Sequence, residues 1–148
     1  MDLNADSAQV NTIPDLAGLE KRDRSRPSGS SVDLGAIREE VLVAAKAALD
    51  VKAEDVKVLD MHELVTYTDF MVLCTGRNSR LTRRIAQEVA HQVKSTSGRV
   101  PVGTEGTNAG EWILLDFLDF VVHVFTPTSR EFYRLDVLWK QAPAEDVV

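Results

Sequence analysis

Two acidic residues three positions apart, Asp116 and Asp119 in LLDFLDF, are the side chains whose type first suggests chemistry. A pair of carboxylates binds a divalent metal for phosphoryl or nucleotidyl transfer when both project from one face of a strand. Side chains alternate between faces, so a shared face needs a spacing of two residues. A spacing of three, across an expected turn, is wrong for one shared metal, and we expect no metal-dependent catalysis here.

The other reactive side chains favour structural roles. His62, His91 and His123 have no second His or Cys at the spacing of metal ligands, and a lone histidine inside the strand-like VVHVF is typical of a core. Cys74 ends an apolar stretch, with no base beside it in the sequence. Residues 74–79 join a strand to a helix and could hold a phosphate, but one glycine falls short of known phosphate-binding fingerprints. We expect neither cofactor nor metal.

Basic residues gather between positions 76 and 99, where six bases stand against one acid. A solvated helix face explains such a run, and a patch that contacts phosphate or an acidic surface is the alternative. Arg80 and Arg84 are the candidates for that contact, which would be peripheral. The whole chain carries a net charge of -6, which argues against a protein that coats nucleic acid without specificity.

The composition is that of an ordinary globular protein. The chain has 148 residues, of which 44% are apolar and 27% charged, enough for one domain and a tail. No run of 18 apolar residues is present, and the start MDLNADSAQV does not resemble a secretory signal. A lone cysteine excludes an internal disulfide. We expect a cytoplasmic protein without a membrane segment.

Hydrophobic periodicity predicts the elements that must position these side chains. One helix is expected over residues 33–49, capped by Asp33 or Ser31, and a second helix from Asn78 or Ser79 to about Ser97. Apolar runs predict four strands, which cover residues 55–61, 69–75, 112–117 and 120–126. A loop with at most a short edge strand is expected over residues 98–110. The order predicts an α/β domain, a small mixed sheet packed with helices.

The two ends of the chain are predicted differently from its middle. A last helix is expected after Thr128, whose spacing to Glu131 fits a capping box. Its predicted buried face consists of Phe132, Leu135, Leu138 and Trp139. Residues 1–34 lack periodicity and predict a mostly disordered tail, with a short helical turn near residues 14–21. The predicted domain therefore covers residues 35–141, and residues 142–148 form a C-terminal tail.

Five segments, in this order, resemble the ribosomal silencing factor family, also called Iojap-like. They are KAEDVKVLDM (52–61), YTDFMVLCTGRNSR (67–80), VGTEG (102–106), GEWILLDFLDFVVHVF (110–125) and REFYRLDVLW (130–139). Each segment alone is weak, whereas their order is specific, and the resemblance covers nearly the whole domain.

The resemblance implies a fold similar to that of nucleotidyltransferases but without their catalytic carboxylates. It also implies a translation repressor that is not an enzyme and has no cofactor. Members of the family bind a ribosomal protein on the joining face of the large ribosomal subunit and block association with the small subunit when nutrients are scarce. Organellar relatives act in large-subunit assembly, which is one alternative. A nucleotidyltransferase-like enzyme that uses the carboxylates and the turn at Gly76 is another.

A binding protein needs aromatic and charged anchors around a dry patch. The residues predicted to bind the partner are Trp112, Asp116, Tyr133, Asp69, Glu105, Arg80 and Arg84. Trp112 could instead belong to the core. We expect Asp116 to pair with a Lys or Arg of the ribosomal protein if it is partly exposed, and to be structural if it is buried against the protein's own backbone.

Leu118 departs from the family pattern, which usually places glycine between the two acids. Either the turn is reshaped or Leu118 is exposed as an extra contact. We also expect the free protein to be a homodimer, because the strand pair over residues 112–126 could leave an open sheet edge that invites self-pairing. The resemblance points the same way.

Overall fold

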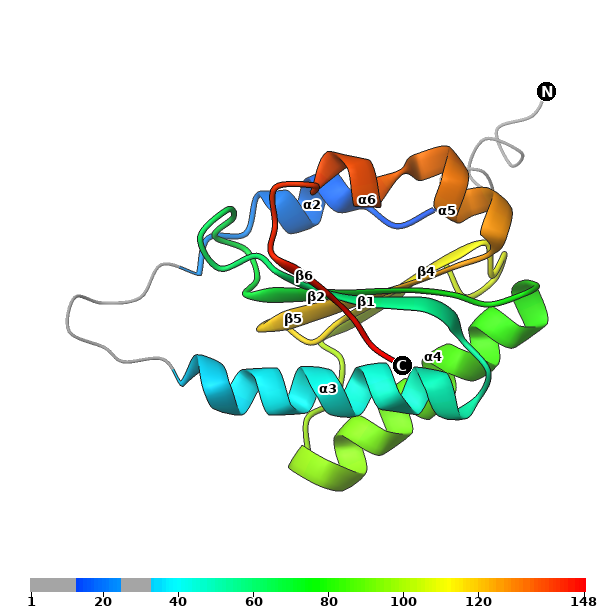
Figure 1. Ribbon diagram of the computed structural model, residues 1–148, viewed down its shortest axis with the longest axis horizontal. Helices are drawn as coiled ribbons and strands as arrows, with labels where there is room; N and C mark the ends of the chain where they lie inside the picture. Colours follow the sequence, from blue (N-terminus) through cyan, green and yellow to red (C-terminus); the bar gives the residue numbers. More distant parts are fainter. Residues whose placement is uncertain (1–12, 25–32) are drawn as a thin grey trace.

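The fold is seen in a computed structural model, which describes residues 13–24 and 33–148 (Figure 1). Its helices are α2 (Leu16–Glu20), α3 (Leu34–Asp50), α4 (Ser79–Ser97), α5 (Pro127–Tyr133) and α6 (Leu135–Leu138). Its strands are β1 (Glu54–Asp60), β2 (Phe70–Thr75), β3 (Gly103–Glu105), β4 (Trp112–Asp116), β5 (Phe120–Phe125) and β6 (Ala144–Asp146). The predicted α/β class is confirmed.

The strands form a mixed sheet in the order β3-β4-β5-β2-β1-β6 within the described residues. β2 and β5 are parallel, with Phe70 opposite Phe120, and the other neighbours are antiparallel. A parallel pair needs a long crossover. Here that crossover runs through α4, β3 and β4. The topology places the central strands β2 and β5 between layers on both faces, which accounts for their continuous apolar sequences.

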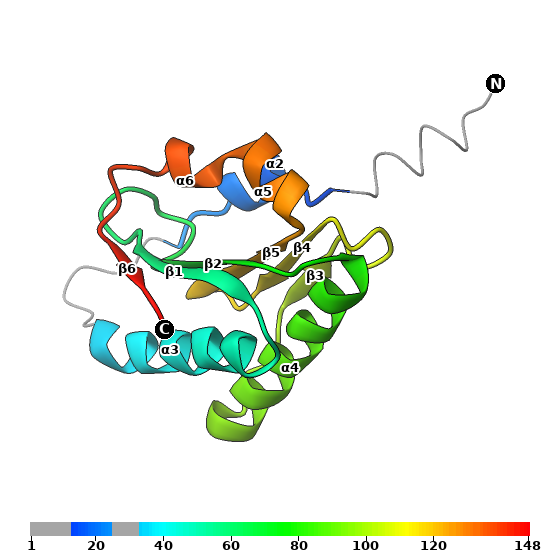
Figure 2. The same ribbon diagram turned by 45° about the vertical axis from the view of Figure 1, so that its right-hand side comes forward.

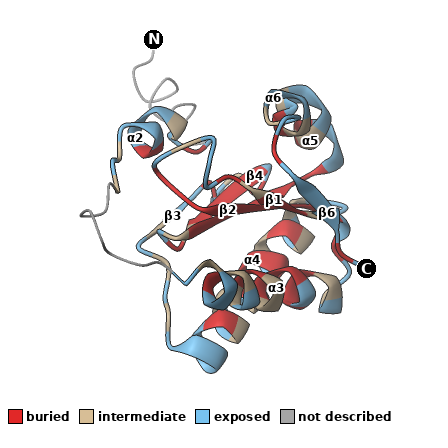
Figure 3. Ribbon diagram, turned by 60° about the vertical axis from the view of Figure 1, so that its left-hand side comes forward, coloured by how far each residue is buried: buried red, intermediate tan, exposed pale blue. Residues whose placement is uncertain are grey.

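Helices cover both faces of the sheet (Figures 1 and 2). α3 and α4 lie on one face, and α2, α5 and α6 lie on the other. Because side chains alternate along a strand, Phe70 and Val72 of β2 join the core beneath α3 and α4, whereas Met71 and Leu73 join the core on the opposite face. Figure 3 shows the buried residues concentrated in the sheet and on the inner sides of α3 and α4.

The two long helices begin and end as their sequences predict. Asp33 caps α3 and accepts a hydrogen bond from the backbone of Ala36 at 3.0 Å. Asn78 caps α4 and accepts from Leu81 at 2.9 Å. Gly98 ends α4 in the left-handed region, with φ 77°, where glycine carries no steric penalty. No helix in the described part of the chain is long and apolar enough to cross a membrane.

The last predicted helix is wrong in its start and in half of its buried face. Thr126, and not Thr128, is the N-cap, because Pro127 at the first helical position starts the helix two residues earlier. Arg134 then adopts a left-handed conformation with φ 53° and divides the segment into α5 and α6. This break shifts the helical phase, so Leu135 is buried and Trp139 packs against the core as predicted, whereas Phe132 and Leu138 are exposed.

Two predicted tails contain structure. Ala144–Asp146 forms β6, which pairs with β1, so the C-terminal residues belong to the sheet and not to a tail. Residues 13–24 include α2, whose Leu19 is buried in the core, so the prediction of disorder is wrong for this part. Residues 1–12 and 25–32 lie outside the described residues. The short helical turn predicted near residues 14–21 is confirmed.

The predicted open edge is also wrong. β4 and β5 pair with each other and are covered by β3 on one side and β2 on the other. Within the described residues, the edges of the sheet are the short strands β3 and β6, and short edges are poor templates for self-pairing. The expected homodimer therefore rests on the family resemblance alone.

Candidate functional site

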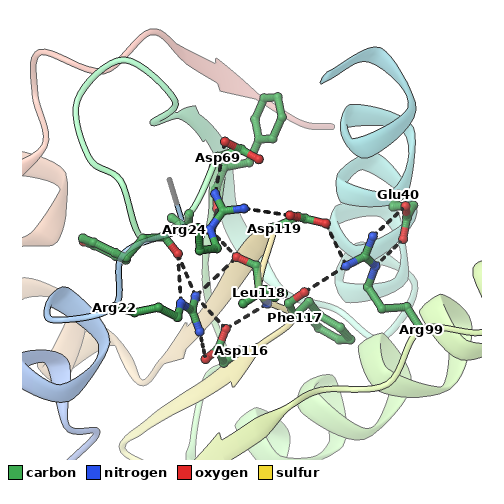
Figure 4. A network of polar contacts seen from close by, with 12 residues as sticks. Arg22, Arg24, Glu40, Asp69, Arg99, Asp116, Phe117, Leu118 and Asp119 are labelled. Carbon is green, nitrogen blue, oxygen red and sulfur yellow. Dashed lines mark hydrogen bonds and ion pairs between the residues drawn. The ribbon is translucent and has the colours of Figure 1, made fainter. Parts of the chain in front are cut away.

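Three aspartates meet at one end of the sheet and form what we call the acidic cluster, defined as Asp69, Asp116 and Asp119 (Figure 4). Asp69 precedes β2 and Asp119 precedes the parallel strand β5, while Asp116 ends the antiparallel strand β4. These ends coincide because of the strand directions, and the backbone N–H of Asp69 donates to the carbonyl oxygen of Asp119 at 3.0 Å. The topology thus gathers carboxylates that lie far apart in the sequence.

The acidic cluster holds Arg22, which comes from the segment that follows α2. Its Nη1 donates to Asp116 Oδ2 at 2.6 Å and its Nη2 to Asp116 Oδ1 at 3.2 Å. Nε and Nη2 donate to the carbonyl oxygen of Tyr67 at 3.2 and 2.7 Å, and Nη2 also reaches the carbonyl oxygen of Leu118 at 3.3 Å. A two-point contact of this kind matches the planar fork of a guanidinium group.

Arg24 binds the other two carboxylates. Its Nη1 lies 2.8 Å from Asp119 Oδ1 and its Nη2 lies 3.1 Å from Asp69 Oδ1. The second oxygen of Asp119 lies 3.0 Å from Nη1 of Arg99, which also pairs with Glu40 at 2.7 Å. The hydrogen bond that Arg99 donates to the Glu40 carboxylate is the main cause that raises the pKa of Arg99. Asp119 therefore lies between two guanidinium groups.

Asp116 is neither free nor purely structural. Its side chain is 13% exposed, and its Oδ1 accepts a hydrogen bond from the backbone of Leu118 at 2.9 Å. The turn keeps the shape that suits glycine, because Leu118 adopts φ 75° and stays partly exposed. The condition set for a partner contact, partial exposure, is met, but the protein's own Arg22 occupies the carboxylate.

Trp112 is a core residue, and its prediction as a surface anchor is wrong. It is 2% exposed, it stacks on Phe125, and its Nε1 donates to Nδ1 of His123 at 3.0 Å. Burial lowers the pKa of His123 to about 3, so the imidazole is neutral. Tyr133 packs on Trp112 and stays partly exposed, so of the two aromatic anchors only Tyr133 reaches the surface. The structural reading of His123 is confirmed.

Glu105, which is predicted to contact the partner, lies beside the acidic cluster. Its carboxylate accepts a hydrogen bond from the backbone of Asp15 at 2.7 Å. A small cavity of about 190 Å³ separates the N-terminal segment from β3 and β4, and Glu105, Arg22 and Asp116 line it. Three of the predicted contacts, Asp69, Asp116 and Glu105, therefore share one surface, which residues 15–24 cover.

Arg80 and Arg84 lie elsewhere, on α4 beneath the opposite face of the sheet. They line an open groove of about 930 Å³ together with Arg77, Arg83 and His91. Arg83 is partly used within the fold, since it donates to the carbonyl oxygens of residues 107 and 108. We call this surface the basic groove, defined as Arg77, Arg80, Arg83 and Arg84. The structure does not bring it together with the acidic cluster.

The described residues offer no metal centre, because no group of three or more His, Cys, Asp or Glu side chains among them could hold a metal ion. The carboxylates of the acidic cluster bind arginines instead. Cys74 is fully buried, and this burial raises the pKa of its thiol to about 12, which leaves it unreactive. The geometry therefore fits the binding of cationic groups and gives no support to nucleotidyl transfer.

The profile of the family described as "Ribosomal silencing factor during starvation" matches residues 35–148. The chain belongs to the ribosomal silencing factor family. The resemblance drawn from the five ordered segments is thus confirmed. The matched family region extends to the C-terminus and includes β6, but it begins after the N-terminal segment.

Similar proteins carry the same family name. Ribosomal silencing factors of Bacillus subtilis and Chromobacterium violaceum are both 35% identical to this chain, over 105 and 103 residues. These alignments cover 71% and 70% of this chain and 88% and 84% of the two relatives. Protein Iojap of maize chloroplasts is 35% identical over 98 residues, which is 66% of this chain and 42% of the maize protein.

Solved structures of similar proteins share the ribosomal silencing factor fold. A crystal structure of a Chromobacterium violaceum protein is 34% identical, with a TM-score of 0.68, and the match covers 76% of this chain and 92% of that chain. A crystal structure from Bacillus halodurans is 33% identical, with a TM-score of 0.64, and covers 74% and 99% respectively.

Sequence reasoning missed Arg22 and Arg24. Both lie in a stretch that its composition assigns to a disordered tail, yet each is an ordered ligand of the acidic cluster. One signal was present in the sequence. Two arginines that are two residues apart, just after a short capped helix, project from the same side of an extended chain. Their partners could not be found locally, since Arg22 and Asp116 are separated by 94 positions.

Proposed function

We propose that this protein represses translation by binding the joining face of the large ribosomal subunit and blocking association with the small subunit. Membership of the ribosomal silencing factor family is the observation that supports this proposal most strongly. The proposed place of action is the cytoplasm, and the proposed mechanism is steric, without catalysis or cofactor.

The partner contact proposed for the acidic cluster is a basic ribosomal protein. A protein of net charge -6 gains little from the release of counterions by RNA alone, so its main contact should be with a positively charged protein surface. The acidic cluster already holds two arginines at hydrogen-bond distance, which is the chemistry that such a partner would offer. Glu105 flanks this surface in the proposal, and Tyr133, which packs on Trp112 at the other end of β4, is a further proposed contact.

The basic groove is proposed to touch ribosomal RNA at the edge of the contact. Arg80 and Arg84 are exposed on one side of α4, one turn apart, and can face consecutive phosphates. Each phosphate contact contributes roughly 0.7–0.9 to the slope of log affinity against log salt concentration. Arg84→Gln should therefore weaken binding and reduce that slope by nearly one. Lys94→Gln, which removes an exposed charge from the far end of the same helix, is the matched control.

Sedimentation with purified ribosomal subunits tests the proposal. The protein should travel with large subunits and not with small ones, and it should reduce the fraction of joined ribosomes when both are present. Binding to both subunits equally, or to neither, would refute it. Binding confined to precursor particles would support the assembly-factor alternative instead.

The oligomeric state is a separate part of the proposal. The family resemblance suggests that the free protein is a homodimer. Light scattering at tens of micromolar should then give twice the chain mass of 16.4 kDa. A monomer mass at that concentration would remove the dimer from the proposal without affecting the rest.

A further inference from the structure

The N-terminal segment, residues 13–24, covers the surface proposed for the partner. Arg22 and Arg24 fill two cation sites whose walls are the acidic cluster and two backbone carbonyl oxygens. The side chains of the two arginines are 22% and 10% exposed, so the carboxylates beneath them are largely closed to solvent. A basic partner could not reach these carboxylates while the segment is in place.

Apart from the arginines, a small apolar contact holds the segment to the domain. α2 has five residues, too few to be stable as an isolated helix; its Leu19 is buried, Leu16 packs against the same core, and Pro14 before it is buried. The backbone of Asp15 adds one hydrogen bond to Glu105. The fit of Arg24 is also imperfect, because its Nε is buried with no hydrogen-bond partner among the described residues, which costs free energy. The arginine contacts are therefore the main polar interactions that keep the segment bound.

The segment is also an addition to the family domain. The family match begins at residue 35, after the segment, whereas Asp69, Asp116 and Asp119 lie inside the match. The cation sites are thus built by the shared domain, and their occupant comes from outside it. Of the carboxylates in this network, Asp119 and Glu40 also pair with Arg99, which belongs to the family domain (Figure 4).

We propose that residues 13–24 are a built-in competitor, which occupies the site where the domain receives two guanidinium groups of a basic protein segment. The partner segment presents them two residues apart along an extended chain, as Arg22 and Arg24 do. Arginine is required at the first position, because its donors meet Asp116 and the carbonyl oxygen of Tyr67 together, which a lysine ammonium cannot reproduce. This inference rests on the proposed function, since the partner is the ribosomal protein.

Competition makes the two halves of one ion pair behave in opposite ways. Arg22→Gln weakens the closed state and leaves the receiving carboxylate intact. Since the apparent affinity is the intrinsic affinity scaled by the open fraction, binding to large subunits should tighten by about tenfold. Asp116→Asn also loosens the segment, but it removes the carboxylate that would receive the partner's guanidinium group. Binding to large subunits should therefore weaken by about 30-fold or more. Lys21→Gln removes a neighbouring exposed charge and should change nothing.

A second arm of the experiment does not need ribosomes. The full chain carrying both Arg22→Gln and Arg24→Gln is titrated with a synthetic peptide of residues 13–24, up to about millimolar, the range of effective concentration for a tethered ligand. The amide resonances of Asp69, Asp116 and Asp119 should shift on titration. A peptide with Arg22→Lys should shift them at concentrations several-fold higher. Hydrogen exchange of residues 16–22 should accelerate in the Arg22→Gln chain and not in the Lys21→Gln chain.

The outcomes separate the inference from the proposed function. If no variant binds large subunits but the peptide binds the acidic cluster, the proposed function fails and the receiving site for a basic segment is supported. If Arg22→Gln weakens subunit binding, the segment is part of the interface and the competition is refuted. An absence of peptide binding, or unchanged exchange in Arg22→Gln, also refutes it.

Discussion

His123 should make the stability of this protein fall in mild acid. It is fully buried on β5, where it accepts the hydrogen bond of Trp112 through Nδ1, so its proton lies on Nε2. That nitrogen is buried without a partner among the described residues. Burial lowers the pKa of His123 from 6.5 to about 3. The folded protein therefore resists a protonation that the unfolded chain accepts readily.

The sign and size of the effect follow from proton linkage. Between the unfolded pKa of 6.5 and the folded pKa of about 3, the unfolded chain binds one more proton at His123 than the folded chain. The contribution to stability is fully present above pH 6.5 and is lost as the pH falls through this window. At about 1.36 kcal/mol per pH unit, the free energy of unfolding should drop by roughly 2 kcal/mol at pH 5.

Urea unfolding followed by circular dichroism from pH 5 to pH 8 measures this drop. The comparison is with His123→Leu, which leaves the Trp112 N–H unpaired and so lowers stability at every pH, but removes the titration. The difference between the two proteins should shrink by about 2 kcal/mol on going from pH 7 to pH 5. Parallel profiles would refute the reasoning. His62→Gln gives a check of sign, because a hydrogen bond with Asp60 raises the pKa of His62, and its contribution is lost as pH rises.

Three further substitutions test the packing around the site by thermal unfolding. Leu118→Gly should stabilise the protein by about 0.5–1 kcal/mol, because it removes the left-handed strain at φ 75° from a residue whose side chain is exposed; a lower melting temperature would contradict this. Gly106→Ala should destabilise it by about 2–4 kcal/mol, because a Cβ there would overlap the carbonyl oxygen of Trp112, and an unchanged melting temperature would show that the loop can move. Arg130→Lys should cost about 2–3 kcal/mol, because lysine cannot replace both the two-point contact with Asp136 and the bond to the Asp55 carbonyl; a cost near zero would mean that these bonds are dispensable.

Local sequence patterns predicted most of the domain, because the starts and ends of its helices and strands depend on residues that are close together in the chain. Caps at Asp33 and Asn78 and the stop at Gly98 depend on neighbours within a few residues. The central strands are apolar on both faces because both faces are covered, and that shows in their composition. The prediction of the last helix was wrong for a local reason as well. Arg134 adopts a left-handed conformation, which changes the phase of a hydrophobic pattern that the prediction treated as one continuous helix.

The N-terminal segment could not be predicted in this way. A prediction from composition asks whether the apolar surface of a segment is large enough to offset the entropy lost when the segment is ordered. Residues 1–34 do not contain enough apolar surface for this. Arg22 and Arg24 are ordered by carboxylates that the segment does not contain, at strand ends brought together by the parallel pairing of β2 and β5. Prediction of this contact requires the sheet topology, which no local pattern gives.

Trp112 illustrates a different error, in which a residue that belongs to the core was predicted to contact the partner. Trp112 and Asp116 are four residues apart on β4, so they lie on the same face of the sheet. That much was predictable, and it made a joint anchor attractive. The face is covered by helices, however, and only its end, at Asp116, is near solvent. The position of a residue along the strand decides how deeply it is buried, and the alternation of side chains does not reveal this position. It places Trp112 in the core and Asp116 near solvent.

The spacing of the two acids in LLDFLDF decides what kind of cation this sheet end can hold. Asp116 faces Arg22, while Asp119, on the far side of the turn at Leu118, faces Arg24 and Arg99. A single metal ion would need both carboxylates on one side at coordination distance. Guanidinium groups are longer and planar, so two of them can serve carboxylates that point in different directions. The spacing that argues against metal chemistry is therefore the same feature that makes this sheet end suitable for two arginines.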